Sequence, residues 1–420
     1  MSTLRLAAAF ACIGSIFSCS QNKAAETPAA PAPATETQVS PATAPTPETI
    51  KLGQTMPYSG PASAYSTIGK VHAGYFKKVN DEGGIQNRKL ELLTLDDAYS
   101  PPKTVEQVRK LVEQDHAAFI FGSVGTPTNS AVHKYLNGKK VPHLFVSTGA
   151  TKWGDPTNYP WTIGFNPTYQ LEGQTYAKHI LANHPKAKIA VLYQNDDYGK
   201  DLLKGLRDGL GEKASMIVKE ATYEVSDATI DSQLASLQAS KATVFVDITT
   251  PKFAAQAVRR VYDSGWKPIH YLNQVGASIA AVLKPAGVEK AVGAYTIGYY
   301  KDPTDEQYDS DPEMQRYKEF MKKYYPDGDL HDGINAYAYM SAQTMVHVLK
   351  QCGTEITSEN VMRQATNIKG FKPELVLPGI SINTAPDDYF TFDQVQMSKF
   401  DGKSWKSQGE AIKVAGVKAP

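Results

Sequence analysis

From residue 50 onward, short runs of β-branched and aromatic residues alternate with longer stretches in which apolar residues recur every three or four positions. Short apolar runs are typical of buried strands, and the longer recurrence is typical of amphipathic helices. The runs predict strands at 50–56, 89–95, 118–122, 143–147, 189–194, 215–219, 244–248 and 270–272. Helical faces are predicted from three apolar sets: Val71, Tyr75, Phe76 and Val79; Val105, Val108, Leu111 and Val112; and Ala254, Ala257, Val258 and Val261. This alternation predicts an α/β fold of doubly wound, mainly parallel sheets covered by helices.

Length and charge narrow the function classes. A chain of 420 residues is too long for one ordinary core, so two packed domains are expected. The net charge is +1 and the charged residues are interspersed, which gives no electrostatic footprint for nucleic acid or for an anionic membrane surface. After residue 20, no apolar stretch is long enough to span a bilayer.

The first nineteen residues have the pattern of an export signal. Arg5 precedes an apolar run at 6–17, which has the length of a signal peptide and is too short for a membrane span. The run ends in Ile16-Phe17-Ser18-Cys19, which resembles the bacterial lipobox, with Phe17 bulkier than usual. The resemblance implies cleavage before Cys19 and a lipid on its thiol, so the only expected membrane contact is this anchor. An ordinary secretory signal cut a few residues later is the alternative. Both predict a periplasmic or cell-surface protein.

The segment 20–48 consists almost wholly of Ala, Pro, Thr, Glu, Gln and Ser, and it predicts a disordered, extended tether. Of the three cysteines, Cys12 lies in the signal and Cys19 in the lipobox, which leaves Cys352. No disulfide is therefore expected within one mature chain. Cys352 ends an apolar helical pattern and is expected to be inert packing.

Four joints between predicted strands and helices carry hydroxyl residues beside Pro or Gly, at 58–61, 125–128, 147–151 and 249–251. Thr126 and Thr250 are predicted helix N-caps, each followed by proline. Helix N-termini offer free N–H groups and a positive dipole end, which suit a carboxylate. Ligands of open α/β sheets bind beyond the carboxyl ends of the strands, where such joints gather. Plain helix capping is the alternative for each joint.

Several of these segments resemble the leucine/isoleucine/valine-binding protein family. A first strand ends in Ser59-Gly60-Pro61, a helix ends in Asp81-Glu82-Gly83-Gly84-Ile85, and Asp-Asp and Pro-Pro-Lys follow within 92–103. Further matches are Phe121-Gly122-Ser123, Asp197-Tyr198-Gly199-Lys200, Gly265-Trp266 and, as the family's closing strand, Phe400-Asp401-Gly402-Lys403-Ser404-Trp405. The resemblance covers about residues 50–406, and its motifs are specific as a set.

The resemblance implies a type I periplasmic binding fold, in which two Rossmann-like lobes are joined by three crossovers and close on a ligand. We expect the crossovers near 164–168, 297–301 and 377–388. Lobe one then comprises 50–166 and 300–377, and lobe two comprises 167–299 and 378–410.

The resemblance also implies the ligand-binding residues. Thr126 and Thr151 match hydroxyls that hold a ligand carboxylate, and Gly149 matches a backbone contact. Tyr198 matches an aromatic residue that faces the cleft from lobe two. The remaining predicted contacts are Tyr58, Ser59, Tyr65, Thr249 and Gln274. For Tyr58 and Tyr65, packing between the lobes is the alternative.

One departure bears on the ligand. Relatives that bind amino acids pair the ammonium group with an acidic residue in a strand-end loop of lobe two, but here that loop, 272–276, reads Leu-Asn-Gln-Val-Gly. Asp247 or Asp197 could substitute. The segment 160–165 resembles a subgroup associated with aromatic or other carboxylic acids. The ligand is thus a branched-chain amino acid or a similar small carboxylate, or an aromatic or aliphatic acid without an ammonium group.

No catalytic spacing is present: the chain has no G-x-S-x-G, P-loop, H-E-x-x-H, C-x-x-C or G-x-G-x-x-G motif. Asp327, Asp329 and Asp332 crowd a turn that is expected to be a solvated loop, with weak cation binding as the alternative. The prediction is a monomeric solute-binding protein without a cofactor, which serves an ABC permease and ATPase. A ligand-sensing module that acts through a separate receptor is the alternative class.

Overall fold

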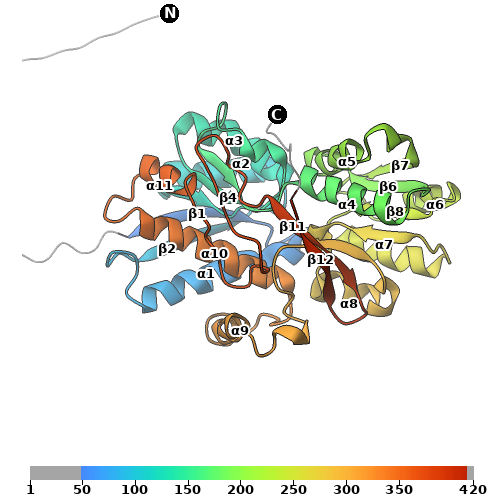
Figure 1. Ribbon diagram of the computed structural model, residues 1–420. Helices are drawn as coiled ribbons and strands as arrows, with labels where there is room; N and C mark the ends of the chain where they lie inside the picture. The colour runs from blue at the N-terminus through green and yellow to red at the C-terminus, as the bar shows by residue number, and fades with distance from the viewer. Residues whose placement is uncertain (1–48, 414–420) are drawn as a thin grey trace, which may run out of the picture. The chain divides into compact units, whose positions relative to one another are not determined.

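The computed structural model describes residues 49–413, which build two sheets (Figure 1). The first sheet has the order β2-β1-β3-β4-β5 and is parallel throughout. Its strands are β1 (Ile50–Met56), β2 (Leu90–Asp96), β3 (Phe119–Phe121), β4 (His143–Val146) and β5 (Thr162–Gly164). The predicted doubly wound α/β architecture is confirmed in this half of the described chain.

The second sheet has the order β12-β11-β10-β9-β8-β6-β7. Its strands are β6 (Ile189–Gln194), β7 (Ile217–Tyr223), β8 (Val244–Ile248), β9 (Ile269–Leu272), β10 (Tyr295–Gly298), β11 (Gln394–Phe400) and β12 (Trp405–Lys413). The pairs from β7 to β10 are parallel, whereas β11 runs antiparallel to both β10 and β12. An antiparallel hairpin therefore closes one edge of this sheet.

Helices connect the strands, and the predicted apolar faces lie against the sheets. The helices are α1 (Ser66–Asp81), α2 (Pro101–Arg109), α3 (Thr126–Lys139), α4 (Tyr169–Asn183), α5 (Asp197–Leu210), α6 (Asp231–Ala239), α7 (Pro251–Asp263), α8 (Lys284–Ala286), α9 (Pro312–Tyr324), α10 (Gly333–Gln351) and α11 (Ser358–Ala365). The apolar sets predicted for α1 and α7 are fully buried, and Val108 and Leu111 are buried at the end of α2. Cys352 caps α10 and is a buried free thiol, whose pKa burial raises to about 11.

The chain crosses three times between the elements around the first sheet and those around the second. It leaves the first sheet after β5, and it returns after β10, because α9 and α10 pack against α1 (Figure 1). It leaves again after α11 to form β11. Two of these passages run together, since Lys301 N donates to Leu375 O over 2.7 Å and Leu377 N donates to Tyr299 O over 3.0 Å. The residue boundaries of the two lobes stay a prediction.

Helices α4 and α5 cross at glycines. A Cβ atom at Gly205 would lie 2.4 Å from the carbonyl oxygen of Gln170, and one at Gly173 would lie 2.3 Å from that of Leu202. Such distances are shorter than any van der Waals contact, so the two helices can approach this closely only because both residues lack a side chain.

Some element predictions were wrong. The segment 400–405 is the turn between β11 and β12, because the Asp401 carboxylate accepts from the N–H groups of Lys403 and Ser404 at 2.7 and 2.8 Å. The strand predicted at 215–219 begins at Ile217, after a 3₁₀ turn at Gly211–Met216. Thr126 is the first residue of α3, and its N-cap is Gly125 at φ 104°, a conformation that favours glycine. Thr250 caps α7 as predicted, but its hydroxyl lies 3.3 Å from that of Tyr223.

Within residues 49–413, no helix is long and apolar enough to cross a bilayer. The signal peptide, the Cys19 lipobox and the tether predicted at 20–48 lie outside this range.

Candidate functional site

A cavity of about 110 Å³ lies beyond the carboxyl ends of strands from both sheets. Around the first sheet, it is lined by the start of α1, the β3–α3 joint and the end of β4. Around the second sheet, it is lined by the first turn of α5, the cap of α7, the loop after β9, strand β10 and the start of β12. This is the position at which open α/β sheets bind ligands, because the strand-to-helix joints meet there.

Four of the predicted ligand contacts line this cavity: Tyr65, Thr126, Tyr198 and Gln274. The Thr126 and Thr148 hydroxyl oxygens are 2.5 Å apart, at the N-terminus of α3. Tyr198 OH donates to Asn273 Oδ1 over 2.9 Å. The structure thus brings together residues that are widely separated in sequence, although their roles as ligand contacts stay predictions.

Tyr65 also bridges the elements around the first sheet and those around the second, whereas Gln274 bonds to the segment that follows β10. Tyr65 OH donates to the carbonyl oxygen of Val275 over 2.9 Å, and Gln274 Nε2 donates to Tyr300 OH over 3.1 Å. Packing between lobes, the alternative for Tyr65, therefore coexists with its place in the cavity wall.

The other five predicted contacts are outside the cavity lining, and three of them, Tyr58, Ser59 and Thr249, are bonded to neighbouring side chains. Tyr58 OH lies 2.7 Å from Thr94 Oγ1, and Ser59 Oγ donates to Asp96 Oδ2 over 2.6 Å. Thr249 Oγ1 donates to Asp247 Oδ1 over 2.6 Å. Gly149 packs so closely that a Cβ atom would lie 2.4 Å from the carbonyl oxygen of Pro167.

Thr151, the fifth, already binds a carboxylate, and that carboxylate belongs to the protein. Its amide and its hydroxyl both donate to Oδ2 of Asp201 in α5, and Gln170 Nε2 donates to Oδ1 of the same side chain over 2.7 Å. Burial raises the pKa of Asp201, while these hydrogen bonds act in the opposite direction. The sequence resemblance predicted that Thr151 binds a carboxylate. It did not indicate that the acceptor is Asp201, which lies 50 residues further along the chain.

The two aspartates considered as partners for a ligand ammonium group are not in the cavity wall. Asp247 is fully buried and bonded to Thr249 and His270. Asp197 is exposed and forms an ion pair with Lys152 over 2.8 Å. The carboxylate that does line the cavity is Asp302, which sequence reasoning missed.

A usable signal for Asp302 was present in the sequence. Thr296, Gly298, Tyr300 and Asp302 all line the cavity, and they occupy alternate positions from β10 onward. Alternate residues of an extended segment share one face, so a period of two at the expected crossover would have placed Asp302 in the site.

Aromatic side chains form much of the remaining wall, and none of these six was predicted from the sequence. They are Tyr99, Tyr169, Tyr300, Tyr308, Tyr337 and Trp405. Burial raises the pKa of Tyr169 and of Tyr337, so both hydroxyls stay protonated and able to donate at neutral pH. The Tyr169 and Tyr198 rings lie 4.9 Å apart.

With this geometry in view, comparison with known proteins is informative. The periplasmic binding protein family matches residues 49–390. The chain belongs to this family. A Leu/Ile/Val-binding protein homolog 7 of Brucella abortus is 22% identical over 403 residues, covering 90% of this chain and 96% of the relative. The resemblance to the leucine/isoleucine/valine-binding proteins is thereby confirmed.

Solved structures show the same fold. A possible leucine/isoleucine/valine-binding protein from Rhodopirellula baltica has a TM-score of 0.77 at 20% identity, covering 88% of this chain and 98% of its own. A branched chain amino acid ABC transporter protein from Thermus thermophilus with bound valine has a TM-score of 0.80 at 16% identity, with 88% and 97% covered. A fatty acid ABC transporter substrate-binding protein from Thermomonospora curvata has a TM-score of 0.73 at 20% identity, with 88% and 93% covered.

In this periplasmic binding protein, no Lys or Arg of residues 49–413 lines the cavity. The one histidine of this range that lines the cavity, His331, lies 3.5 Å from Asp329. The hydroxyls of Thr126 and Thr148 and the free N–H groups at the start of α3 are neutral donors that suit a ligand carboxylate. Hydroxyl and amide donors with aromatic walls suit the binding and orientation of a small molecule.

Within residues 49–413, which include the aspartate turn at 327–332, no three or more His, Cys, Asp or Glu side chains are grouped so that they could hold a metal ion. Asp332 is buried rather than solvated, which differs from the expectation. It caps α10 by accepting from Ile334 N, and it also accepts from Ser278 Oγ over 2.9 Å. This aspartate therefore organises the cavity wall, since Ser278 lines the cavity.

Proposed function

We propose that this chain is the extracytoplasmic solute-binding protein of an ABC importer. In this proposal it captures a branched-chain amino acid or a similar small carboxylate between its two lobes by hinge closure. The observation that carries the proposal is the cavity itself, which combines neutral carboxylate donors at the N-terminus of α3 with aromatic walls contributed by both halves of the chain. The names of the Brucella and Thermus relatives, which refer to branched-chain amino acids, agree with it.

The two paired segments at 299–301 and 375–377 are the proposed hinge. They connect the elements around one sheet to those around the other, and two backbone hydrogen bonds join one segment to the other. Rotation about such short connecting segments opens and closes a cleft without rebuilding either core.

Binding is tested by the thermal unfolding of the purified chain with a panel of amino acids and organic acids. A ligand that binds only the folded protein raises the midpoint temperature, because it stabilises the fold by about 2.7 kcal/mol at a hundredfold excess over Kd. A panel in which no small carboxylate moves the midpoint would contradict the proposal.

A second candidate is a binder of aromatic or aliphatic acids without an ammonium group. The absence of a carboxylate from the loop 272–276 favours it, as does the similarity to the fatty acid ABC transporter protein. The same panel separates the candidates when each amino acid is compared with its deaminated counterpart.

The lipid anchor is part of the proposal as well. The lipobox at 16–19 predicts that Cys19 carries the acyl chains and that 20–48 tethers the binding unit to a membrane, beside its permease and ATPase. Cys19→Ser should move the protein from the membrane fraction to the soluble fraction, whereas Cys12→Ser, inside the signal, should not. A Cys19→Ser protein that stays with the membranes would rule out the anchor.

A further inference from the structure

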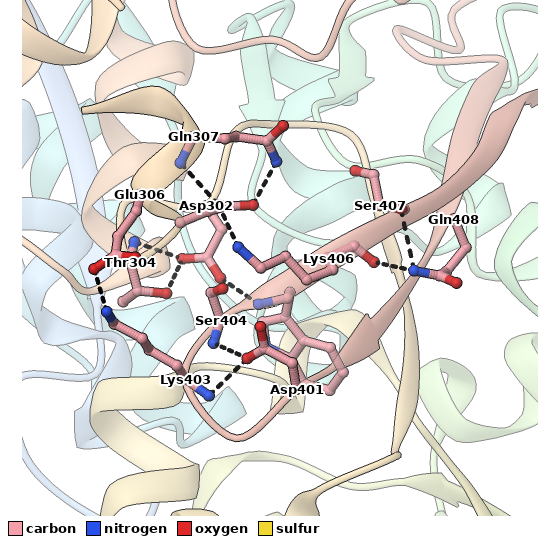
Figure 2. A network of polar contacts seen from close by, with 12 residues as sticks. Asp302, Thr304, Glu306, Gln307, Asp401, Lys403, Ser404, Lys406, Ser407 and Gln408 are labelled. Carbon is pink, nitrogen blue, oxygen red and sulfur yellow. Dashed lines mark hydrogen bonds and ion pairs between the residues drawn. The ribbon is translucent and has the colours of Figure 1, made fainter. Parts of the chain in front are cut away.

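Asp302 is the only carboxylate in the cavity wall of residues 49–413, and its position is fixed by the backbone around it. Its Oδ1 accepts from the amide and the hydroxyl of Thr304 at 2.9 and 2.8 Å, and its Oδ2 accepts from the amide of Trp405 at 2.8 Å (Figure 2). The last of these bonds reaches to β12, so the carboxylate joins two segments that both line the cavity.

The lysines around Asp302 are all paired with other acids. Lys301 forms ion pairs with Asp311 and Glu313, at 2.5 and 2.7 Å. Figure 2 shows Lys403 beside Glu306, and the third lysine, Lys406, lies 2.5 Å from the carboxylate of Asp305. None of these contacts reaches the carboxylate of Asp302.

The charge of Asp302 is therefore uncompensated within the described part of the chain. Burial raises the pKa of this carboxyl, although the hydrogen bonds from Trp405 and Thr304 act to lower it. A carboxylate that is withdrawn from water without a cationic partner is costly, and such groups in folded proteins are normally paired.

The surroundings of Asp302 suit a cation. Tyr300, Tyr308 and Trp405 also line the cavity, and aromatic faces attract cations through their quadrupoles. Thr296, which is 3% exposed, lies on the same extended segment, and its Oγ1 has no hydrogen-bond partner among residues 49–413. A buried free hydroxyl in a cavity wall points to a polar group supplied by the ligand.

We propose that Asp302 binds the cationic group of the ligand, and that the ligand therefore carries an amine as well as a carboxylate. The assignment rests on the proposed function, and it selects amine-bearing acids over the second candidate class. The ammonium partner absent from the loop 272–276 is replaced by a carboxylate at the start of the segment that follows β10. The carboxylate of the ligand then lies toward Thr126 and its ammonium group toward Asp302.

A purely structural role for Asp302 is the competing explanation, and the chain offers a matched control for it. Asp401 also accepts from backbone amides in a nearby turn, those of Lys403 and Ser404, but it is exposed and outside the cavity wall (Figure 2). If Asp302 only stabilised its turn, then Asp302→Asn and Asp401→Asn would have similar effects on ligand selectivity.

The test is isothermal titration calorimetry on the wild-type chain with pairs of amino acids and their deaminated acids, including leucine with 4-methylpentanoate and the ω-amino acid 5-aminopentanoate. The wild type should bind the better amine-bearing ligand at least about tenfold more tightly than its deaminated counterpart. Asp302→Asn should abolish this preference by weakening only the amine-bearing ligand, and Asp401→Asn should keep it. The ω-amino acid shows how far the cation lies from the carboxylate.

The outcomes separate the two proposals. Equal affinity of the wild type for amino acids and deaminated acids overturns the Asp302 assignment and leaves the proposed function intact. The absence of binding by every compound in the panel overturns both. Should Asp302→Asn fail to fold in a thermal scan, the wild-type measurement still tests the assignment, because equal affinities would overturn it without any variant.

Discussion

The amide and the hydroxyl of Thr151 both donate to the same oxygen of Asp201, Oδ2, each over 2.7 Å. Thr151 follows β4 of the first sheet, and Asp201 lies in α5 beside the second sheet. The bond therefore links elements around the first sheet to elements around the second sheet near the cavity. Hydrogen bonds to a charged acceptor are among the stronger ones in proteins, so this pair stabilises the arrangement of the two sides seen here.

Asp201→Asn should lower the free energy of unfolding by about 1–3 kcal/mol, because a charged acceptor is lost and one buried donor of Thr151 faces an amide instead. Denaturant titration measures the change. Asp208→Asn on the same helix is the control, since Asp208 is paired only at the surface with Lys204 and should change stability by less than about 0.5 kcal/mol. Equal effects of the two variants would show that the Thr151 bond contributes little.

Thr126→Val should weaken the binding of a carboxylate ligand by about ten- to a hundredfold, because it removes a hydroxyl donor from the cavity without changing the shape of the side chain. Calorimetry with the tightest ligand of the panel measures the change. Thr157→Val, at an exposed position outside the cavity, should leave the affinity unchanged. An unchanged affinity for Thr126→Val would remove Thr126 from the ligand site.

Stability should fall as the pH drops below 6.5, because two buried histidines stay neutral in the folded protein. Burial lowers the pKa of His72 to about 3, and burial together with His133 lowers that of His143 to about 3. The unfolded chain takes up protons at 6.5 and the folded chain does not, so stability is present above 6.5 and is lost as the pH falls toward 3. Each histidine contributes a slope of up to about 1.4 kcal/mol per pH unit.

Denaturant midpoints measured from pH 7 to pH 4 check this dependence. His72→Gln should flatten the profile, since glutamine can still bond to Gln54 and Ser341 but does not titrate. His116→Gln, at an exposed position, should leave the slope of the stability profile as in the wild type. A His72→Gln profile as steep as that of the wild type would contradict the assignment.

Gly205→Ala should destabilise the protein by about 1–3 kcal/mol, because the added methyl group would overlap the backbone of Gln170 where α4 and α5 cross. Gly138→Ala is the matched control: Gly138 also lies within a helix, and nothing is within 4 Å of an added Cβ atom there. That variant should gain about 0.4–1 kcal/mol. Thermal unfolding of the two variants should therefore give shifts of opposite sign.

The fold could be predicted from sequence because its strands are buried on both faces and read as continuous apolar runs, as in β1 and β8. The strands that were missed lack this signal. Half-exposed β11 and β12 carry polar residues on one face, and β5 and β10 have only three and four residues. A short or polar strand is specified by its neighbours more than by its own composition.

The site was only partly predictable for a related reason. Tyr65, Thr126, Tyr198 and Gln274 sit on joints with recognisable local patterns, and the structure places all four in the cavity wall. Whether Thr151 faces a ligand or Asp201 depends on how closely α5 approaches the end of β4, which no local pattern encodes. Asp302 was not predicted, because it lies on the segment that follows β10 and the site prediction used the strand-end loops.

The hairpin at the edge of the second sheet has a consequence for the order in which the protein becomes functional. Trp405 and Ser407 of β12 belong to the cavity wall, and the Trp405 amide holds the Asp302 carboxylate. During synthesis the cavity therefore stays incomplete until residue 407 has been made and β12 has paired with β11. Ligand cannot bind the complete site before this hairpin has formed, and premature termination at any codon before the hairpin would yield a chain unable to form that site.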